Sequence, residues 1–263
     1  MLSYLDLNFK DFNGREADLK NIYRYGPYKP MFYRTNLWIH SHRLVWFIEE
    51  ITPLVKKSFP HFNASLAKTM AAIHDDFEII MGDVQLGSKL IMSPDEKLKL
   101  KYQEREAIEK ISQRFPTMIN GFSYKELLLR YENFAPNDIE STIVKLVDKF
   151  DAFGEALHEL FAGNALFTKG FATGIPSPLP TYTQILTDFP KKVPLLNFLF
   201  KNNHPLFNIP LLLDAKQISA SGKLHLPEFI SFKHPYPQYH FWKEITLKYG
   251  REEGKSLLTT KIE

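Results

Sequence analysis

The sequence predicts an all-α core followed by a proline-rich extension. Across residues 36–161, apolar side chains recur every three or four positions, and hardly any stretch alternates with the period of two that a strand shows. After Asn164 this periodicity is lost, and prolines gather in the segments PSPLP, HPLFNIP and HPYPQYH. We therefore expect a helical core over residues 1–165. An appendage of short helices and loops over residues 166–263 is expected to pack on it.

The first two predicted helices come from clear amphipathic patterns. One covers residues 36–57 and ends near a proline. The second, capped by Asn63 or Ser65, runs to Ile80 and stops at a glycine. The following segment, residues 83–93, contains a glycine and a serine that interrupt the pattern, so a loop is expected there.

Three more helices are predicted in the core and one near the end of the chain. The motif SPDE at residues 93–96 has the serine, proline and glutamate of a capping box, so a charged helix begins there. A shorter helix is expected over residues 124–132, and a long one over residues 139–161 after the turn-forming segment PND. The last short helix is predicted over residues 239–249.

Composition limits the classes of protein that the chain can belong to. There are no cysteines, which excludes disulfides, thiolate metal sites and cysteine nucleophiles. A net charge of +3 suits a small anionic substrate and is too mild to predict nucleic-acid binding. The apolar runs are too short to span a membrane, and the N-terminus has no signal-peptide pattern. A cytoplasmic protein is therefore expected.

Two histidines and two aspartates from three separated segments form a candidate metal site. His74 and Asp75 stand together in HDDFEIIMGD, with His40 upstream and Asp148 downstream. Such nitrogen and oxygen donors suit Mn²⁺, Co²⁺, Ni²⁺, Fe²⁺, Zn²⁺ or Mg²⁺. Glu78 lies one helical turn after His74, where it can act as general base toward a metal-bound water. The pattern predicts a metal-dependent phosphohydrolase, although an isolated His-Asp pair is more often structural.

The order of these motifs resembles the HD-domain phosphohydrolase superfamily, and within it the bacterial 5′-deoxynucleotidases. The segments RTNLWIHS, HDDFEIIMGD, EAIEKI, LVDKFDAF and ELFAGN carry the resemblance over roughly residues 20–165. It implies an HD-domain helical bundle and a homodimer. It also implies that the ligands of one divalent metal ion are His40, His74, Asp75 and Asp148.

The resemblance also implies roles for residues around the metal. Glu78 is the expected catalytic carboxylate, beside the ligand Asp75. Arg24 corresponds to an arginine near the phosphate, and Tyr25 replaces the tryptophan that usually follows it. This replacement bears on the sugar contact more than on the metal chemistry.

Two further residues are assigned to the substrate by the same resemblance. Asp83 is expected beside the sugar hydroxyl, and Lys89 is a weaker candidate for a phosphate contact. The sequence departs from the family at Ile39, where a glutamate usually precedes the first histidine. It also departs in the loop after Asp83, which lacks the usual proline, and in the long C-terminal appendage.

The last metal ligand has two candidates, Asp148 and Asp151, which share one helix face. Alignment with the family motif favours Asp148, and Asp151 is expected to pair with a base or line the site. Asp76 and Glu155 are interpreted as solvated or salt-bridged carboxylates.

The predicted function is hydrolysis of a deoxyribonucleoside 5′-monophosphate to a deoxynucleoside and phosphate, with a small nucleotide as the partner molecule. Two alternatives keep the site and change the substrate: a (d)NTP triphosphohydrolase and a cyclic-nucleotide phosphodiesterase. A third alternative is a non-catalytic HD domain that serves as a binding or scaffold module. The four ligands argue against this last alternative.

Overall fold

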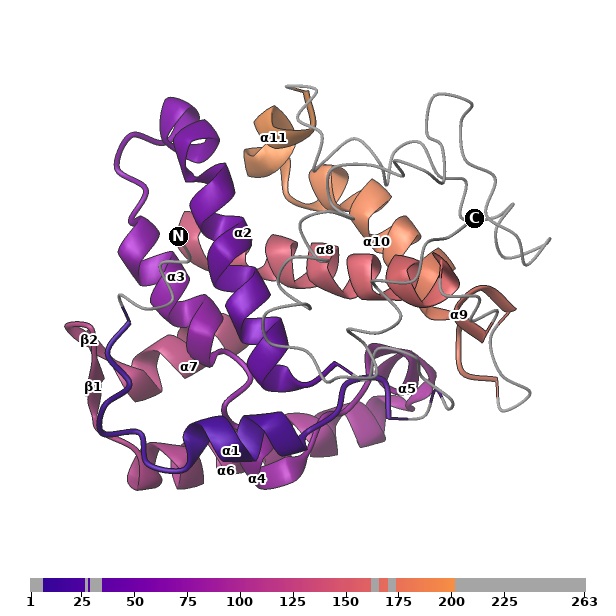
Figure 1. Ribbon diagram of the computed structural model, residues 1–263. Coiled ribbons are helices and arrows are strands. Elements are labelled where there is room, and N and C mark those ends of the chain that lie inside the picture. Colours follow the sequence, from indigo (N-terminus) through magenta and orange to yellow (C-terminus); the bar gives the residue numbers. More distant parts are fainter. Residues whose placement is uncertain (1–6, 27, 29–34, 162–165, 170–173, 202–263) are drawn as a thin grey trace. The chain divides into compact units, whose positions relative to one another are not determined.

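Helices make up nearly all of the regular structure among the described residues, so the all-α prediction is confirmed (Figure 1). The computed structural model describes residues 7–26, 28, 35–161, 166–169 and 174–201. Its internal contacts divide the chain into two units. The first unit comprises Met1–Gly26, Asn36–Gln85 and Met92–Asp148, and the second comprises Pro27–Thr35, Leu86–Ile91 and Lys149–Glu263.

Two capped helices, α2 (Leu37–Ser58) and α3 (Ala64–Ile73), pack together in the first unit (Figure 1). The side chain of Asn36 accepts a hydrogen bond from the N–H three residues on, at 3.0 Å, and so starts α2. Asn63 starts α3 in the same way, also at 3.0 Å, so the structure selects it over Ser65 as the cap. Fully buried apolar side chains of the two helices include Leu44, Ile48, Ile51, Met70 and Ile73.

Four more helical segments belong to this first unit. They are α1 (Arg15–Asn21), α4 (Glu78–Met81), α6 (Pro94–Arg114) and α7 (Tyr124–Glu132). Helix α1 packs on α2, and α6 packs on both α4 and α7. The predicted capping box starts α6, with the side chain of Ser93 bonded to the N–H of Glu96 and the side chain of Glu96 bonded back. The bounds of α7 agree with the prediction.

A small hairpin between α6 and α7 was not predicted. Strands β1 (Met118–Ile119) and β2 (Phe122–Ser123) pair antiparallel. The turn between them is formed by Asn120 and Gly121, with φ angles of 49° and 83°. Both positive angles belong to a tight two-residue turn that favours Asn-Gly. Strands of this length are too short for alternation to reveal them in the sequence.

The predicted second helix differs from the structure at its C-terminal end. It ends at Ile73, residues 74–77 form turns, and α4 follows before Gly82. The N–H of Asp76 bonds to the carbonyl of Ile73 at 2.8 Å, and that of Glu78 bonds to the carbonyl of Asp75 at 2.9 Å. These bonds reach back three residues instead of four, so the backbone is wound more tightly than an α-helix. Apolar periodicity alone does not distinguish the two windings.

The predicted loop over residues 83–93 contains the short helix α5 (Leu86–Ile91), which lies in the second unit. Gly87 does not break this helix. A Cβ atom at Gly87 would lie 2.7 Å from the hydroxyl oxygen of Tyr28 and 2.9 Å from a methyl of Ile175. The glycine therefore permits a close contact between segments of the second unit, which the sequence pattern does not report.

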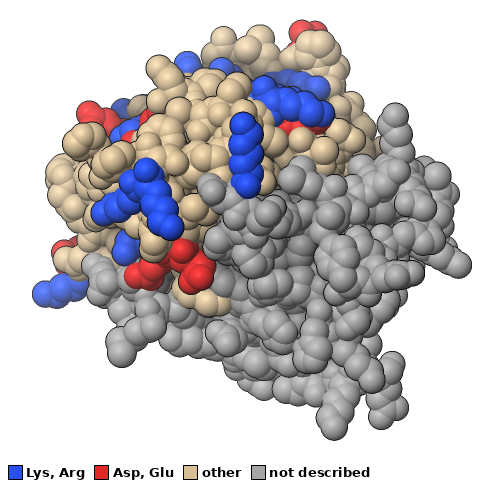
Figure 2. Space-filling view, turned by 90° about the horizontal axis from the view of Figure 1, so that it is seen from above, with Lys and Arg blue, Asp and Glu red and all other residues tan. Residues whose placement is uncertain are grey.

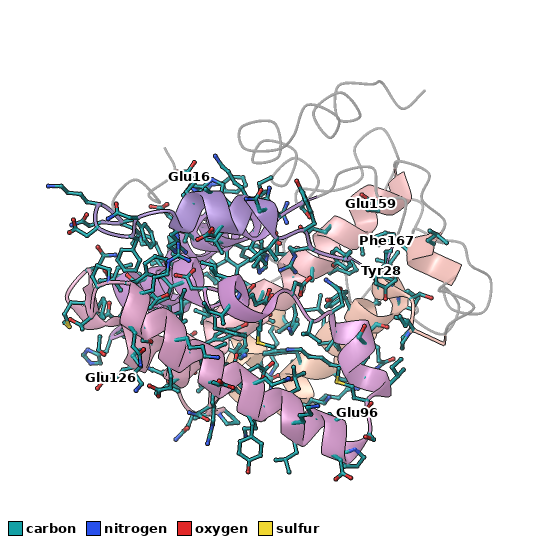
Figure 3. The ribbon with its side chains drawn as sticks, turned by 90° about the horizontal axis from the view of Figure 1, so that it is seen from below. Glu16, Tyr28, Glu96, Glu126, Glu159 and Phe167 are labelled. Carbon is teal, nitrogen blue, oxygen red and sulfur yellow. The ribbon has the colours of Figure 1, made fainter. Side chains whose placement is uncertain are left out.

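The second unit also contains the later part of α8 (Ile139–Phe161), a helix whose bounds agree with the prediction. Four further helical segments are α9 (Leu166–Lys169), α10 (Pro178–Lys192), the 3₁₀ helix η2 (Pro194–Leu196) and α11 (Asn197–Lys201). Tyr28 packs beside Phe167, with ring centroids 5.5 Å apart (Figure 3). The helix predicted over residues 239–249 lies outside the described residues.

None of the described helices combines the length and the apolar character that a bilayer crossing requires. On the face shown in Figure 2, Lys and Arg side chains of the described residues are interspersed with uncharged residues. The charged helix α6 carries paired side chains, such as Lys110 and Glu106 at 2.7 Å, as expected for a solvated face.

Candidate metal centre

The first histidine of the candidate site is placed by the start of α2. Asn36 caps this helix, and His40 follows one turn later with its side chain fully buried. The next histidine, His42, bonds through Nδ1 to the carbonyl of Trp38 at 2.7 Å and packs against that indole. His42 is thus held by contacts within its own helix.

The tightly wound segment after α3 carries the second part of the site. His74 is buried, and its Nδ1 lies 2.8 Å from the carbonyl oxygen of Ala71. Because a carbonyl can only accept, Nδ1 holds the proton, and in the neutral ring Nε2 presents its lone pair. The backbone of its own turn therefore fixes the tautomer that a metal ligand needs.

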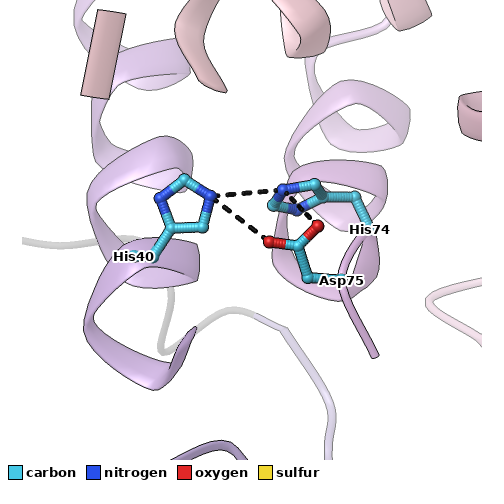
Figure 4. Close-up of side chains that lie close together, drawn as sticks. All are labelled: His40, His74 and Asp75. Carbon is cyan, nitrogen blue, oxygen red and sulfur yellow. Dashed lines mark hydrogen bonds and ion pairs between the residues drawn. The ribbon is translucent and has the colours of Figure 1, made fainter. Parts of the chain in front are cut away.

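Three side chains from two segments converge on one point (Figure 4). His40 Nε2 lies 3.3 Å from His74 Nε2 and 3.5 Å from Asp75 Oδ2. The distance from His74 Nε2 to Asp75 Oδ1 is 3.1 Å. One donor atom from each of the three residues falls within 4.8 Å of the others.

The fourth predicted ligand approaches the same point from α8. Asp148 is buried, and its Oδ1 lies 3.4 Å from His40 Nε2. Its other oxygen accepts a hydrogen bond from the hydroxyl of Tyr131, on α7, at 3.1 Å. The ring of Tyr131 also meets the ring of His74 edge-on, with centroids 4.8 Å apart. Tyr131 therefore contacts two of the predicted ligands, although no motif in the sequence marks it.

These donors fit a divalent cation. Ligand atoms bound at about 2.1 Å in tetrahedral or octahedral geometry lie about 3.0–3.4 Å from one another. The distances from His40 Nε2 to the other three side chains are 3.3, 3.5 and 3.4 Å. Two imidazole nitrogens and two carboxylates, with no sulfur, form a donor set that accepts several first-row metals and Mg²⁺.

Electrostatics favour an ionised carboxylate at the centre. Burial acts to raise the pKa of Asp75, but the charge and hydrogen bond of His74, together with His40, outweigh it and lower the pKa below its usual value. The neighbouring charge of Asp148 opposes this lowering. Burial raises the pKa of Tyr131 well above its ordinary value, helped by the charges of Asp148 and Asp75. Tyr131 therefore remains a neutral hydrogen-bond donor.

A buried arginine borders the cluster. Arg24 is mostly buried, and its guanidinium nitrogen lies 3.8 Å from Asp75 Oδ2. Tyr25 follows it with a φ of 57° and a fully buried ring, whose centroid lies 5.9 Å from the Arg24 guanidinium carbon. Left-handed backbone at a bulky residue is uncommon and marks a constrained segment.

The remaining predicted site residues differ in their placement. Glu78 is the first residue of α4 and is buried. Asp83, just beyond the end of α4, accepts a hydrogen bond from the side chain of Gln85 at 2.6 Å. Lys89 lies on α5, in the second unit, and its role remains a prediction.

Three carboxylates that the sequence does not assign as metal ligands are buried. Asp151 and Glu155 lie in the second unit with almost no exposed surface, so neither is solvated. Asp76 is bound by Arg15 at 2.7 Å through both of its oxygens. The salt-bridged interpretation of Asp76 is correct, but sequence periodicity gave no signal for its partner Arg15.

Within this helical core, His and Asp side chains from α2, from the turn after α3 and from α8 converge on a candidate metal centre. The sequence model of the YfbR-like 5′-deoxynucleotidases matches residues 12–175, which is more than half of the chain. The chain therefore belongs to the YfbR-like 5′-deoxynucleotidase family.

Other comparisons are more distant. No curated protein matches this chain. Four chains of solved structures match, among them a conserved hypothetical protein from Pyrococcus furiosus. That protein is 21% identical, with 70% of this chain and 91% of that chain covered and a TM-score of 0.49.

Proposed function

We propose that this protein is a divalent-metal-dependent 5′-deoxynucleotidase. It would convert a deoxyribonucleoside 5′-monophosphate and water to a deoxynucleoside and phosphate. The observation that carries the proposal is the approach of His40 Nε2 to His74, Asp75 and Asp148 within 3.5 Å, in a member of a 5′-deoxynucleotidase family.

The metal would be held by His40, His74, Asp75 and Asp148. When bound, a divalent ion supplies Lewis acidity, which lowers the pKa of water and neutralises charge on a phosphoryl group. In the neutral ring, the hydrogen bond from His74 Nδ1 to the carbonyl of Ala71 leaves Nε2 as the nitrogen that would bind the metal. The hydroxyl of Tyr131 holds one oxygen of Asp148, which leaves the other directed at His40.

The proton and phosphate would be handled by two further residues. Glu78 would accept the proton of the attacking water as general base, which its motif spacing and burial support. Arg24 would donate hydrogen bonds to the phosphate oxygens, because its guanidinium already lies beside Asp75. Binding of the substrate would thus place its phosphate beside Arg24, next to Asp75.

Substrate recognition would involve the rim of the site. We propose that Asp83 accepts a hydrogen bond from the deoxyribose hydroxyl, and that Tyr25 replaces the tryptophan of related sequences beside the sugar. Lys89 would provide a supplementary phosphate contact. The homodimer, the cytoplasmic location and the appendage over residues 166–263 remain predictions from the sequence.

Phosphate release from nucleotides tests this function. Metal-stripped protein is resupplied with Mn²⁺, Co²⁺, Mg²⁺ or Zn²⁺ and offered ribo- and deoxyribonucleoside mono- and triphosphates. We expect metal-dependent orthophosphate from deoxyribonucleoside monophosphates. Glu78→Gln should lower kcat by about 100-fold or more, since general-base catalysis contributes about that much. Glu126→Gln, on the exposed surface of α7, is the matched control and should retain activity.

The same panel separates the alternatives. Tripolyphosphate released from triphosphates would assign a triphosphohydrolase, and opening of a cyclic nucleotide would assign a phosphodiesterase. A protein that binds metal and nucleotide without turnover would be a binding module. Each of these results would overturn the proposed 5′-deoxynucleotidase activity.

A further inference from the structure

Arg15 and Asp76 form a buried ion pair at the turn that carries the predicted metal ligands His74 and Asp75. Arg15, on α1, donates from Nε to Asp76 Oδ2 and from its terminal nitrogen to Asp76 Oδ1, both at 2.7 Å. The hydroxyl of Tyr124, the first residue of α7, donates to Asp76 Oδ2 at 2.9 Å. All three residues are at most 1% exposed.

Arg15 also replaces part of the helical hydrogen bonding that the turn gives up. In a regular α-helix the N–H of Asp76 would bond to the carbonyl of Ala72. Here it bonds to the carbonyl of Ile73, and Arg15 donates its terminal N–H to the Ala72 carbonyl instead. The guanidinium therefore stabilises both the side chain and the backbone of the tightly wound segment.

Aromatic rings pack against Arg15 and against Tyr124. The guanidinium carbon of Arg15 lies 4.2 Å from the centroid of the Phe9 ring, and Phe12 meets the ring of Tyr124 at 5.3 Å. A charge-assisted, bidentate contact in such surroundings has one favoured geometry. The segment between Ile73 and Glu78 is thus fixed from the helix α1 side by contacts that include no predicted metal ligand.

We propose that Arg15 and Tyr124, acting through Asp76, are positioning residues of the metal centre. Asp76 follows Asp75 in the chain. The tight winding of this turn determines the direction in which the side chains of His74 and Asp75 point. Partners that orient a ligand from outside the coordination shell affect metal affinity by about 10- to 100-fold. The inference deepens the proposed function, because it concerns the same metal site.

The test uses a variant that removes the Arg15–Asp76 ion pair without leaving a buried charge. Arg15→Met/Asp76→Leu replaces the pair by apolar side chains, an exchange that often preserves stability, whereas breaking one partner does not. Tyr124→Phe removes only the hydroxyl. Leu19→Ala is the control, because it creates a cavity at another buried position of helix α1 and leaves Arg15, Asp76 and Tyr124 in place.

Mn²⁺ affinity by calorimetry and thermal unfolding are measured for each full-length variant. We expect Mn²⁺ binding to weaken about 10-fold or more in the double variant and less in Tyr124→Phe. Leu19→Ala should lower the melting temperature but bind Mn²⁺ like the parent. Equal Mn²⁺ affinity in the parent and the double variant, or a loss of affinity that merely follows the melting temperature across all variants, would overturn the proposal.

A second readout does not depend on metal binding. The imidazole ¹⁵N shifts of His40 and His74 are recorded in metal-free protein by nuclear magnetic resonance. The double variant should shift both signals, while Leu19→Ala should leave them in place. If the parent binds no divalent cation, the proposed function fails. Unmoved histidine signals in the double variant would then also refute the positioning role, and moved signals would support it.

Discussion

The hydroxyl of Tyr131 donates to Asp148 Oδ2 at 3.1 Å, while Asp148 Oδ1 lies 3.4 Å from His40 Nε2. One oxygen of the carboxylate is therefore held by a neutral phenol, and the other is presented to the cluster. The burial of Tyr131 keeps its pKa well above the ordinary range, so the donor persists at physiological pH.

Tyr131→Phe should weaken Mn²⁺ binding about 10-fold, because Asp148 loses the bond that orients it. The ring contact with His74 remains, so the fold should be retained. Isothermal calorimetry of metal-stripped protein measures the effect, with the exposed Tyr102→Phe as control. Unchanged Mn²⁺ affinity in Tyr131→Phe would show that Asp148 is oriented by other groups or does not bind the metal.

Metal addition should stabilise the first unit. A ligand present at 100 times its Kd adds about 2.7 kcal/mol to the free energy of unfolding. We expect Mn²⁺ to raise the melting temperature of the parent and EDTA to reverse the rise. In His40→Ala/Asp75→Asn the melting temperature should not respond to Mn²⁺, because two donors of the cluster are removed. An equal response in the double variant would place the metal elsewhere.

The sequence predicted those parts of the fold that local signals determine. The capping box at Ser93 and the segment before Ile139 define helix starts through chemistry within a few residues, and the structure confirms both. The turn after Ile73 is instead contacted by Arg15 and Tyr124, which lie far away in the sequence. Long-range partners of this kind leave no periodic signal, so the continuous helix to Ile80 was wrong.

The candidate site shows the same division. Motif order identified His40, His74, Asp75 and Asp148, whose polar atoms lie close together in the structure. Tyr131 was missed because its role depends on the packing of α7 beside α8 side chains. A tyrosine in a short amphipathic helix has the same sequence pattern whether it packs in the core or orients a ligand.

Asp138 should contribute a pH-dependent stabilisation at the start of α8. It accepts from Arg130 at 2.6 Å and from the N–H of Ser141 at 3.2 Å. Although partial burial acts to raise the pKa of Asp138, the Arg130 and Ser141 hydrogen bonds lower it overall. The stabilisation of the folded state by Asp138 is therefore complete above the pKa of the unfolded-state carboxyl, about 3.9. It is lost as pH falls through the lower pKa of Asp138 in the folded state.

Asp138→Asn keeps the capping ability and removes the charge, so it should cost about 0.5–1 kcal/mol at pH 7. Urea unfolding at a series of pH values measures the difference from the parent, with Asp95→Asn on the exposed first turn of α6 as control. The difference should shrink as the solution is acidified below about pH 4. A difference independent of pH would show that the charge of Asp138 contributes nothing.

Gly87→Ala should destabilise the second unit through one identifiable contact. The new methyl would meet the Tyr28 hydroxyl oxygen at 2.7 Å and the Ile175 methyl at 2.9 Å, closer than such atoms pack. Overpacking of this kind costs about 1–3 kcal/mol. Thermal unfolding of the variant measures it, and Ser88→Ala, the next position of α5, is the control that should change little.

The Tyr28→Phe background tests whether this hydroxyl is the cause. Tyr28→Phe alone should be mildly destabilising, because the hydroxyl donates to the carbonyl of Pro176 at 2.8 Å. Adding Gly87→Ala to it should cost less than in the parent, since one of the two overlapping atoms is gone. Additive losses would mean that Ile175 alone excludes the methyl, and no loss in either background would mean that α5 shifts to accept it.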